Sequence, residues 1–222
     1  MINWIYSRWH HPDRGWDPVK KDYAQRYAEE EWLDIDGRVV AQLEQWSGGL
    51  QGKRLLDLGG GPAQYSIAFA KRGALVTWHD VSRNYLDIAQ AKAKEHGVNI
   101  AFSLGYLEDA ERFLASGFDI VFNRICWYYA RDDRVFADLV YRLVRPGGVG
   151  YVDVPNAESM YTKLSGTIRF RTWLNARTYL KIGHPFPPRG RVAALLQRYP
   201  LALMRIDYRV RENDRILFVR AT

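Results

Sequence analysis

Three consecutive glycines, Gly59 to Gly61, stand between a short apolar stretch and a segment with helical periodicity. Glycines at such a junction allow the backbone to turn sharply and to approach a ligand closely. Asp57 precedes the first glycine by two residues. Its carboxylate suits the ammonium group of an amino-acid ligand, whereas a pyrophosphate gains nothing from it. The arrangement therefore predicts a nucleotide-type ligand that carries a positive charge.

The same loop does not match a dinucleotide fingerprint, because the motif Gly-x-Gly-x-x-Gly needs a third glycine where Gln64 stands. A second carboxylate, Asp80, follows Gly59 by 21 residues, the separation that one strand–helix–strand unit produces. At the end of a second strand Asp80 can accept hydrogen bonds from both ribose hydroxyls, and Val81 can pack against adenine. The alternative is that Asp80 only caps a helix that begins near Ser82.

The chain around these residues alternates short apolar strands with helices, which predicts a parallel sheet of right-handed strand–helix–strand units. The strands are continuous apolar runs, as expected where helices cover both faces of a sheet. Glycines and a Pro-Gly-Gly turn end the helices. We expect strands at residues 54–58, 74–79, 98–103, 118–123 and 149–154, and helices at 63–72, 82–96, 107–114 and 132–144.

Two further regions flank this core. Before it we expect helices at residues 19–32, starting at Asp17-Pro18, and at 36–46. After it we expect a long basic and aromatic helix at 158–182, a rigid loop at 183–188, a helix at 191–199, and a hairpin of strands 203–210 and 215–220 linked by residues 211–214. One domain, residues 1–222, would thus consist of an N-terminal helical cap (1–50), a cofactor-binding core (51–154), a substrate-side insertion (155–202) and a closing hairpin (203–222).

These motifs resemble those of class I S-adenosylmethionine-dependent methyltransferases. The loop after Asp57 resembles their glycine-rich first motif, and Asp80 resembles their ribose-binding acid. The likeness extends over residues 51–154 and includes the segments 104–109, 118–124 and 143–148. The resemblance implies a Rossmann-like, doubly wound α/β fold with seven mostly parallel strands and an antiparallel last strand. It also implies S-adenosyl-L-methionine as the cofactor.

Two positions depart from the pattern of that family. Tyr106 stands where an acid often holds the adenine amino group, so we expect stacking and backbone contacts there, with Asp109 assisting. Ala63 replaces the last glycine of the loop, a small change that leaves close approach possible. Tyr27 lies on a helix that resembles the one closing over the cofactor, where it either touches the methionine carboxylate or packs as an aromatic. The predicted cofactor site comprises Tyr27, Asp57, Gly59, Gly60, Gly61, Asp80, Val81, Tyr106, Leu107 and Asn123.

Methyl transfer from a sulfonium is an in-line displacement, and alignment of the reactants alone can supply roughly 7–11 kcal/mol. A general base is needed only where the nucleophile must lose a proton. His184, Tyr128 and Tyr129 are the candidates, and His10 and His11 are weaker ones. The alternative for His184 is a loop histidine that bonds to the backbone.

Asn123, at the end of the fourth strand, bears on the reaction class. For methylation of an amide or of an exocyclic base nitrogen, the resemblance would imply Asn or Asp followed by Pro-Pro-Tyr or a similar tract. Asn123 is followed by Arg124-Ile125 instead, which argues against these reactions. Metal-dependent members of the family need acidic ligands at the end of this strand. Because Asn123 replaces one of them, we expect no metal.

The acceptor is indicated by charge. The formal net charge is +7, and 13 Lys and Arg face 3 Asp and Glu from Tyr161 to the C-terminus. Clustered cations repel one another on a bare surface, so we predict a small-molecule or glycan acceptor that bears phosphate or carboxylate. An anionic membrane surface is the competing explanation. The cations of the insertion are Arg169, Arg171, Arg177, Lys181, Arg189 and Arg191.

Composition restricts the remaining possibilities. A hydrophobic fraction of 47% with 26% charged residues is typical of a soluble globular protein. The lone Cys126 cannot form an internal disulfide, and no signal peptide or apolar run long enough for a transmembrane segment is present, so we expect a cytoplasmic protein. Two alternatives stay open. An RNA methyltransferase would suit the basic, aromatic C-terminal region, and a catalytically inactive adenosylmethionine-binding protein would suit the fold, although intact Asp57 and Asp80 argue against it.

Overall fold

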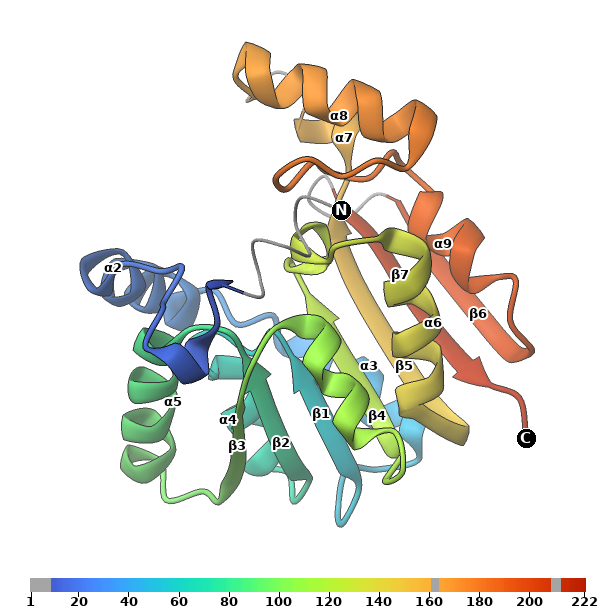
Figure 1. Cartoon of the computed structure of the whole chain (residues 1–222). Helices are drawn as coiled ribbons and strands as arrows, with labels where there is room; N and C mark the ends of the chain where they lie inside the picture. Colours follow the sequence, from blue (N-terminus) through green and yellow to red (C-terminus); the bar gives the residue numbers. More distant parts are fainter. Residues whose placement is uncertain (1–8, 161–163, 209–212) are drawn as a thin grey trace.

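The computed structural model describes residues 9–160, 164–208 and 213–222, which form a seven-stranded sheet with helices on both faces (Figure 1). The strands are Arg54–Leu58 (β1), Leu75–Asp80 (β2), Ile100–Leu104 (β3), Phe118–Arg124 (β4), Val144–Pro155 (β5), Leu201–Asp207 (β6) and Asn213–Arg220 (β7). Their order is β3-β2-β1-β4-β5-β7-β6. Strands β1 to β5 pair in parallel, whereas β7 is antiparallel to both β5 and β6. The predicted Rossmann-like α/β fold is confirmed.

The strand order places a switch point between β1 and β4. From β1 the chain runs outward to β2 and β3, and it then crosses to β4 and β5 on the other side. Connections that diverge in this way leave a crevice at the carboxyl ends of the strands, which is where open α/β sheets bind ligands. Gly59 follows β1 and Ile125 follows β4, so both residues border this crevice.

Apolar cores lie on both faces of the sheet. One face packs against α3 (Gly37–Ser47), α4 (Gln64–Ala70) and α5 (Arg83–Glu95), and the other against η2 (Leu107–Phe113), α6 (Asp133–Leu143) and α9 (Arg191–Leu196). Phe122 stacks on Tyr151 in the first core with ring centroids 5.0 Å apart, and Trp127 packs edge-on against Phe136 in the second at 4.7 Å. Burying such side chains stabilises the fold by about 1.5–3 kcal/mol each, so the strand ends beneath the crevice are firmly held.

The N-terminal region starts differently from the prediction. After the short helix η1 (Pro12–Arg14), the predicted helix at 19–32 begins later, as α2 (Lys21–Leu33), and Pro18 lies outside it. The cause is the Asp17 carboxylate, which accepts hydrogen bonds from Val19 N (2.8 Å) and Asn84 N (2.8 Å). Asp17 therefore fastens the chain to the start of α5 instead of starting a helix. The predicted helix at 36–46 is confirmed as α3.

The predicted helix at 158–182 is wrong in its extent. The structure has α7 (Ala157–Met160) and α8 (Gly166–Thr178), and residues 161–163 lie outside the described part of the chain. α8 ends because Tyr179 adopts a left-handed conformation (φ 61°), which stops a helix. Beyond it Lys181 turns inward and is buried. Figure 1 shows α7 and α8 beyond the carboxyl ends of the parallel strands, on the side of the crevice.

The last elements follow the prediction more closely. α9 is shorter than the expected helix at 191–199, and β6 and β7 form the expected antiparallel hairpin. The predicted link at 211–214 falls partly on residues 209–212, which are outside the described ranges. β5 begins at Val144, so the Pro-Gly-Gly turn is an irregular first part of the strand rather than a link before it. Within residues 9–160, 164–208 and 213–222, no helix has the length and apolar character needed to span a membrane.

Candidate active site

The glycine-rich loop is pinned to β2. Gly59 N and Gly60 N both donate to His79 O, at 2.7 and 3.2 Å. Gly59 has a φ of 82°, in the left-handed region that favours glycine. A Cβ at Gly60 would lie 2.2 Å from Cδ1 of the buried Trp78 ring, so only glycine fits there. The loop after β1 is therefore a tight backbone cradle, as the sequence predicts.

Asp57 is buried beneath this cradle. It is 3% exposed, and its Oδ2 accepts a hydrogen bond of 2.6 Å from Ser66 Oγ on α4. Burial raises the pKa of Asp57 to about 7, although the bond from Ser66 opposes this shift. A carboxyl group held in this way has acceptor positions left for a cationic donor, whose charge would favour the ionised form.

Asp80 is held by backbone amides at the end of β2. Its two oxygens accept from Gly61 N (3.0 Å) and Ser82 N (2.9 Å), and burial raises its pKa to about 6. Ser82, not Asp80, is the N-cap of α5, since the Ser82 hydroxyl accepts from Tyr85 N. Helix capping alone therefore does not explain Asp80. Each oxygen keeps a lone pair with which it can accept from a ribose hydroxyl.

The segment after β3 lies beside the cradle, but its aromatic side chain is engaged elsewhere. The Tyr106 ring stacks on Trp16 at 6.1 Å, and its hydroxyl donates to His10 O. Asp109 Oδ2 accepts from Tyr106 N at 2.8 Å and bonds to His11 Nε2 at 3.1 Å, which fixes this turn. Its assisting role in adenine binding stays a prediction.

Two apolar side chains predicted to contact adenine follow β2 and β3. Val81 is half-buried, and the buried Leu107 lies 3.6 Å from where a Cβ at Gly59 would stand. They offer an apolar surface on which a purine ring can lie. Adenine contacts of Val81, Tyr106 and Leu107 stay predictions.

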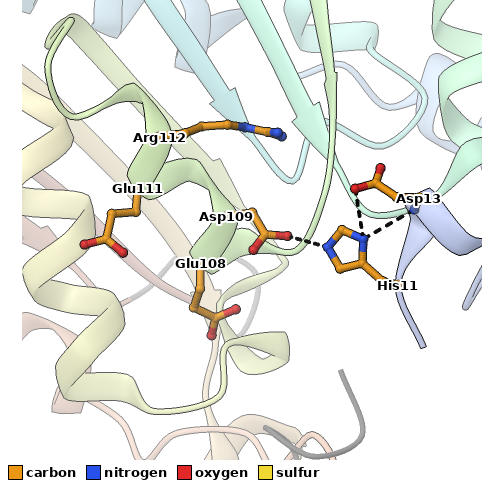
Figure 2. Close-up of a pocket in the computed structure, with 6 residues that line it drawn as sticks. All are labelled: His11, Asp13, Glu108, Asp109, Glu111 and Arg112. Carbon is orange, nitrogen blue, oxygen red and sulfur yellow. Dashed lines mark hydrogen bonds and ion pairs between the residues drawn. The ribbon is translucent and has the colours of Figure 1, made fainter. Parts of the chain in front are cut away.

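An open pocket of about 500 Å³ lies on the outer side of the same turn (Figure 2). Figure 2 shows the His11 ring between Asp13 and Asp109, with Nδ1 3.3 Å from Asp13 Oδ2. These contacts hold the N-terminal segment against η2. The lining residues are His11, Asp13, Glu108, Asp109, Glu111 and Arg112.

The end of β4 supplies an acceptor atom and a strained residue. Asn123 is fully buried; its Nδ2 donates to Leu58 O (2.9 Å) and to Cys126 Sγ (2.9 Å), while its Oδ1 has no hydrogen-bond partner among the described residues. Ile125 has a φ of 56°, a conformation that costs a β-branched residue energy and that often marks functional sites. Burial raises the pKa of the Cys126 thiol, which agrees with a packed side chain rather than a nucleophile.

Glu31 on α2 joins the N-terminal helix to the crevice. Its Oε2 pairs with Arg124 Nη1 at 2.7 Å and accepts from Gln64 Nε2 at 2.9 Å. Tyr27, one turn earlier, packs against Tyr85 with ring centroids 5.9 Å apart, and burial raises its pKa, with Glu31 adding to the shift. Glu31 is missed by the sequence interpretation, because one acid among three consecutive glutamates carries no distinguishing signal.

A second pocket, of about 200 Å³, opens between α2 and the ends of β4 and β5. It borders the strained Ile125 and the Arg124–Glu31 pair, so it lies on the β4 side of the crevice. This position suits the entrance of an acceptor. Its lining residues are Glu31, Asp34, Asp36, Tyr65, Arg124, Ile125, Asp153, Pro155, Asn213 and Arg215.

The three candidate bases are brought together. The rings of Tyr128 and Tyr129 lie 4.3 Å apart by centroid, and the His184 ring contacts Tyr129 edge-on at 4.8 Å. Desolvation raises the pKa of both tyrosines, although Tyr129 is half exposed, so their hydroxyls stay protonated. The His184 side chain is exposed, but partial desolvation by its neighbours and the charges of Lys181 and Arg171 lower its pKa, and a neutral imidazole can accept a proton. The catalytic roles stay predictions, with His184 chemically best suited.

Two of the six cations in the insertion make buried contacts within the protein, so the prediction that all six face an anionic acceptor is corrected. Lys181 Nζ is fully buried and bonds to Asp133 Oδ1 on α6 at 2.9 Å, and Arg191 Nη1 lies 3.8 Å from Asp133 Oδ2. Arg191 also donates to Asn175 Oδ1 and stacks over Tyr179. Neither residue is exposed to repel its neighbours or to grip an acceptor.

The residues at the crevice fit S-adenosylmethionine. The cofactor carries an ammonium for the buried Asp57 and the orphaned Asn123 Oδ1, two ribose hydroxyls for Asp80, and an adenine ring for the apolar residues beside the cradle. A pyrophosphate would instead place negative charge beside two buried carboxyl groups. In the described part of the chain, no group of three or more His, Cys, Asp and Glu is arranged to hold a metal ion; metal independence stays a prediction.

Comparisons with known proteins agree with this geometry. A family model described as "Methyltransferase domain" matches residues 55–148. The ubiquinone biosynthesis O-methyltransferase of Erwinia tasmaniensis is 30% identical over 68% of this chain and 64% of its own length. The tRNA 5-carboxymethoxyuridine methyltransferase of Escherichia coli is 32% identical over 53% of this chain and 44% of its own length. The chain thus spans less than two thirds of each of these relatives.

Solved structures show the same fold. One from Methanococcus maripaludis, described as a candidate S-adenosylmethionine-dependent methyltransferase, has a TM-score of 0.64 and 18% identity, and the match covers 91% of this chain and 94% of the other. The magnesium protoporphyrin IX methyltransferase of Synechocystis, solved with adenosylmethionine bound, has a TM-score of 0.54 and 18% identity over 90% of this chain and 84% of the other. Residues 55–148 thus match the methyltransferase domain family, and the chain has the fold of class I S-adenosylmethionine-dependent methyltransferases.

Replacing Asp80 by alanine should weaken adenosylmethionine binding by about 1.5–3 kcal/mol, because hydrogen bonds to a charged group are lost. Calorimetric titration measures this change. Ser82→Ala is the matched control, since it removes the cap of α5 but leaves the carboxylate. Equal effects of the two substitutions would mean that Asp80 serves only the helix start.

Proposed function

We propose that this chain transfers the methyl group of S-adenosylmethionine to an oxygen or nitrogen atom of a small-molecule or glycan acceptor. The observation that carries the proposal is the pair of buried carboxyl groups, Asp57 and Asp80, on either side of a glycine cradle at the switch point of the sheet. A protein that only needed to fold would gain nothing from burying two acids there, because desolvation of a carboxylate is costly.

Bound adenosylmethionine supplies an electrophilic methyl group, and the chain supplies its position. Asp57 and Asn123 would hold the amino-acid end, and Asp80 the ribose. The acceptor would enter from the pocket beside Ile125, and His184 would take the proton of an acceptor hydroxyl or amine. Alignment is then the main contribution of the protein to the rate.

The direct test is thermal stability with and without ligands. Adenosylmethionine and its demethylated product should each raise the melting temperature, because a ligand of the native state stabilises it. NAD should not raise it. A larger shift with NAD than with adenosylmethionine would overturn the proposal.

Cofactor affinity should rise with pH between 6 and 8. The ammonium of the cofactor needs the ionised form of Asp57, whose pKa is about 7 in the ligand-free protein. One required deprotonation at this pKa makes binding about tenfold tighter at pH 8 than at pH 6. Titration calorimetry at the two pH values checks this slope, and Asp57→Asn should both weaken binding and flatten the slope. Equal affinity of the unmodified chain at both values would contradict the role of Asp57.

The anionic-acceptor hypothesis now depends on the cations that face the base candidates. Arg171 is one of them: its Nη1 would lie 2.9 Å from a Cβ at Gly183, and its charge lowers the pKa of His184. Arg171→Gln should raise the acceptor KM about tenfold or more, as expected for a lost charged hydrogen bond, and leave cofactor affinity unchanged. Arg72→Gln, in an exposed ion pair with Glu44 just after α4, is the control. An unchanged KM, or a neutral acceptor, would count against this hypothesis.

Methylation of RNA is the second candidate, favoured by the similarity to the Escherichia coli tRNA enzyme and by the basic insertion. Mass spectrometry of a metabolite extract and of total tRNA, each incubated with the chain and adenosylmethionine, separates the two. A gain of one methyl group in tRNA alone would replace the small-molecule proposal.

A further inference from the structure

α8 has an inverted distribution of side chains. On the side toward the protein, Thr172 is 3% and Asn175 0% exposed, whereas Phe170 and Trp173 on the opposite side are 60% and 49% exposed. Helices at the surface of globular proteins show the reverse pattern, with apolar side chains against the core. Neighbouring exposed aromatic side chains therefore mark a surface that a partner covers.

The polar side of α8 has a clear structural use. Arg191 Nη1 donates to both the Asn175 carbonyl oxygen and Oδ1, each at 2.9 Å, and Arg191 Nη2 donates to Ala176 O at 2.6 Å. These bonds fix the side that α8 turns to the protein. Phe170 and Trp173 are consequently held on the outside by the buried contacts of the same helix.

The outer face is cationic as well as apolar. Phe170 and Trp173 stack with centroids 6.0 Å apart, and the Arg177 guanidinium lies 4.5 Å over the Trp173 ring. Leu180, just beyond the helix, is 48% exposed. The sequence holds no Asp or Glu from residue 159 to residue 206. We call Phe170, Trp173, Arg177 and Leu180 the α8 outer face.

We propose that the α8 outer face docks on the surface of an anionic lipid bilayer. Aromatic side chains favour the headgroup level of a membrane, arginine binds lipid phosphates, and a cationic surface is attracted to an anionic leaflet. α8 stands beyond the carboxyl ends of the strands (Figure 1), so docking would bring the crevice close to the membrane. The inference goes beyond the proposed function and does not depend on which acceptor is methylated.

Two other occupants suit this face less well. In a symmetric contact with a second copy, the same patch meets itself, so Arg177 would face like charges with no acid from this helix to offset them. For a single-stranded nucleic acid, bases need open aromatic faces. Phe170 lies one turn before Trp173 and Arg177 one turn after it, so both faces of the indole are already flanked, and the aliphatic Leu180 offers nothing to a base.

Flotation of the full chain with vesicles tests the proposal. The chain should bind vesicles of phosphatidylcholine with phosphatidylglycerol and bind those of phosphatidylcholine alone at least about fivefold less, since the attraction is partly electrostatic. Phe170→Ser with Trp173→Ser, and separately Arg177→Gln, should each lower binding to the anionic vesicles about fivefold. Leu33→Ser with Arg26→Gln makes equivalent changes on the exposed side of α2 and should leave binding unchanged.

Melting temperatures with and without adenosylmethionine show whether each variant is folded and binds cofactor, so failure of docking and failure of the proposed function are distinguishable. Absent binding to anionic vesicles, or equal binding by the α8 and α2 variants, would overturn the proposal. Two further results would also overturn it. One is binding of a labelled single-stranded RNA that the α8 substitutions abolish, with no binding to vesicles. The other is a dimer at sedimentation equilibrium that the same substitutions dissociate.

Discussion

Gly60→Ala is expected to lower the free energy of unfolding by about 3 kcal/mol, near the upper end of the range for overpacking a core. The added methyl group would lie 2.2 Å from Trp78 Cδ1 and 2.5 Å from Trp78 Nε1. The indole cannot simply move aside, because it is fully buried and its Nε1 donates to Gly61 O at 3.0 Å. Either the ring or the loop must shift. Because that loop carries the backbone of the cofactor cradle, the cofactor-induced rise in melting temperature should disappear as well.

Urea denaturation and ligand-dependent melting measure the two effects of Gly60→Ala. Gly61→Ala is the matched control for stability. A Cβ at Gly61 meets no atom within 4 Å, so the cost there is that of a left-handed conformation, about 1–2 kcal/mol. If the two substitutions destabilise the chain equally, the contact with Trp78 does not constrain the loop.

The central strands could be predicted from the sequence because β1 and β4 are local, mostly apolar runs. Leu55 to Leu58 is almost wholly buried, and residues 118–123 follow the same rule, so pattern and burial coincide. The cradle could be predicted for a related reason. Glycine and a nearby acid are placed by a local turn, and their spacing along the chain survives folding unchanged.

Other features depend on contacts between residues far apart in the sequence, which no local pattern encodes. Asp17 reads as a helix start but bonds to Asn84, 67 residues away. The chain from 158 to 182 has the composition of a helix, yet Tyr179 ends α8 and the burial of Lys181 depends on Asp133, 48 positions earlier. The strain at Ile125 could not be predicted, because isoleucine does not favour a left-handed conformation and therefore gives no signal of one in the sequence.

Asp133 is the residue that ties the insertion to the sheet. It is 1% exposed at the start of α6, and its Oδ1 accepts from Lys181 Nζ at 2.9 Å and from Trp127 Nε1 at 3.2 Å. Arg191 lies 3.8 Å from its Oδ2. One carboxylate thus connects the segment after α8, the start of α9 and the aromatic residues after β4. The helix start adds to its stability, because the positive end of the helix dipole favours a carboxylate.

Asp133→Ala should therefore cost about 3–5 kcal/mol of unfolding free energy, the range for breaking a buried ion pair by removal of one partner. The cost arises because Lys181, fully buried, would lose the carboxylate that it faces. Asp132→Ala is the control. Asp132 caps the same helix, α6, and pairs with Arg134 in a more exposed position. Its removal should cost about 1 kcal/mol of unfolding free energy. A second variant, Asp133→Ala with Lys181→Met, removes both charges and should recover a large part of the loss, as expected when the buried charge rather than the packing is responsible. Denaturant unfolding of the three variants measures these free energies. Equal losses of unfolding free energy for Asp133→Ala and Asp132→Ala, or no recovery in the double variant, would contradict the prediction. The insertion would then be held in place by its apolar contacts and not by this carboxylate.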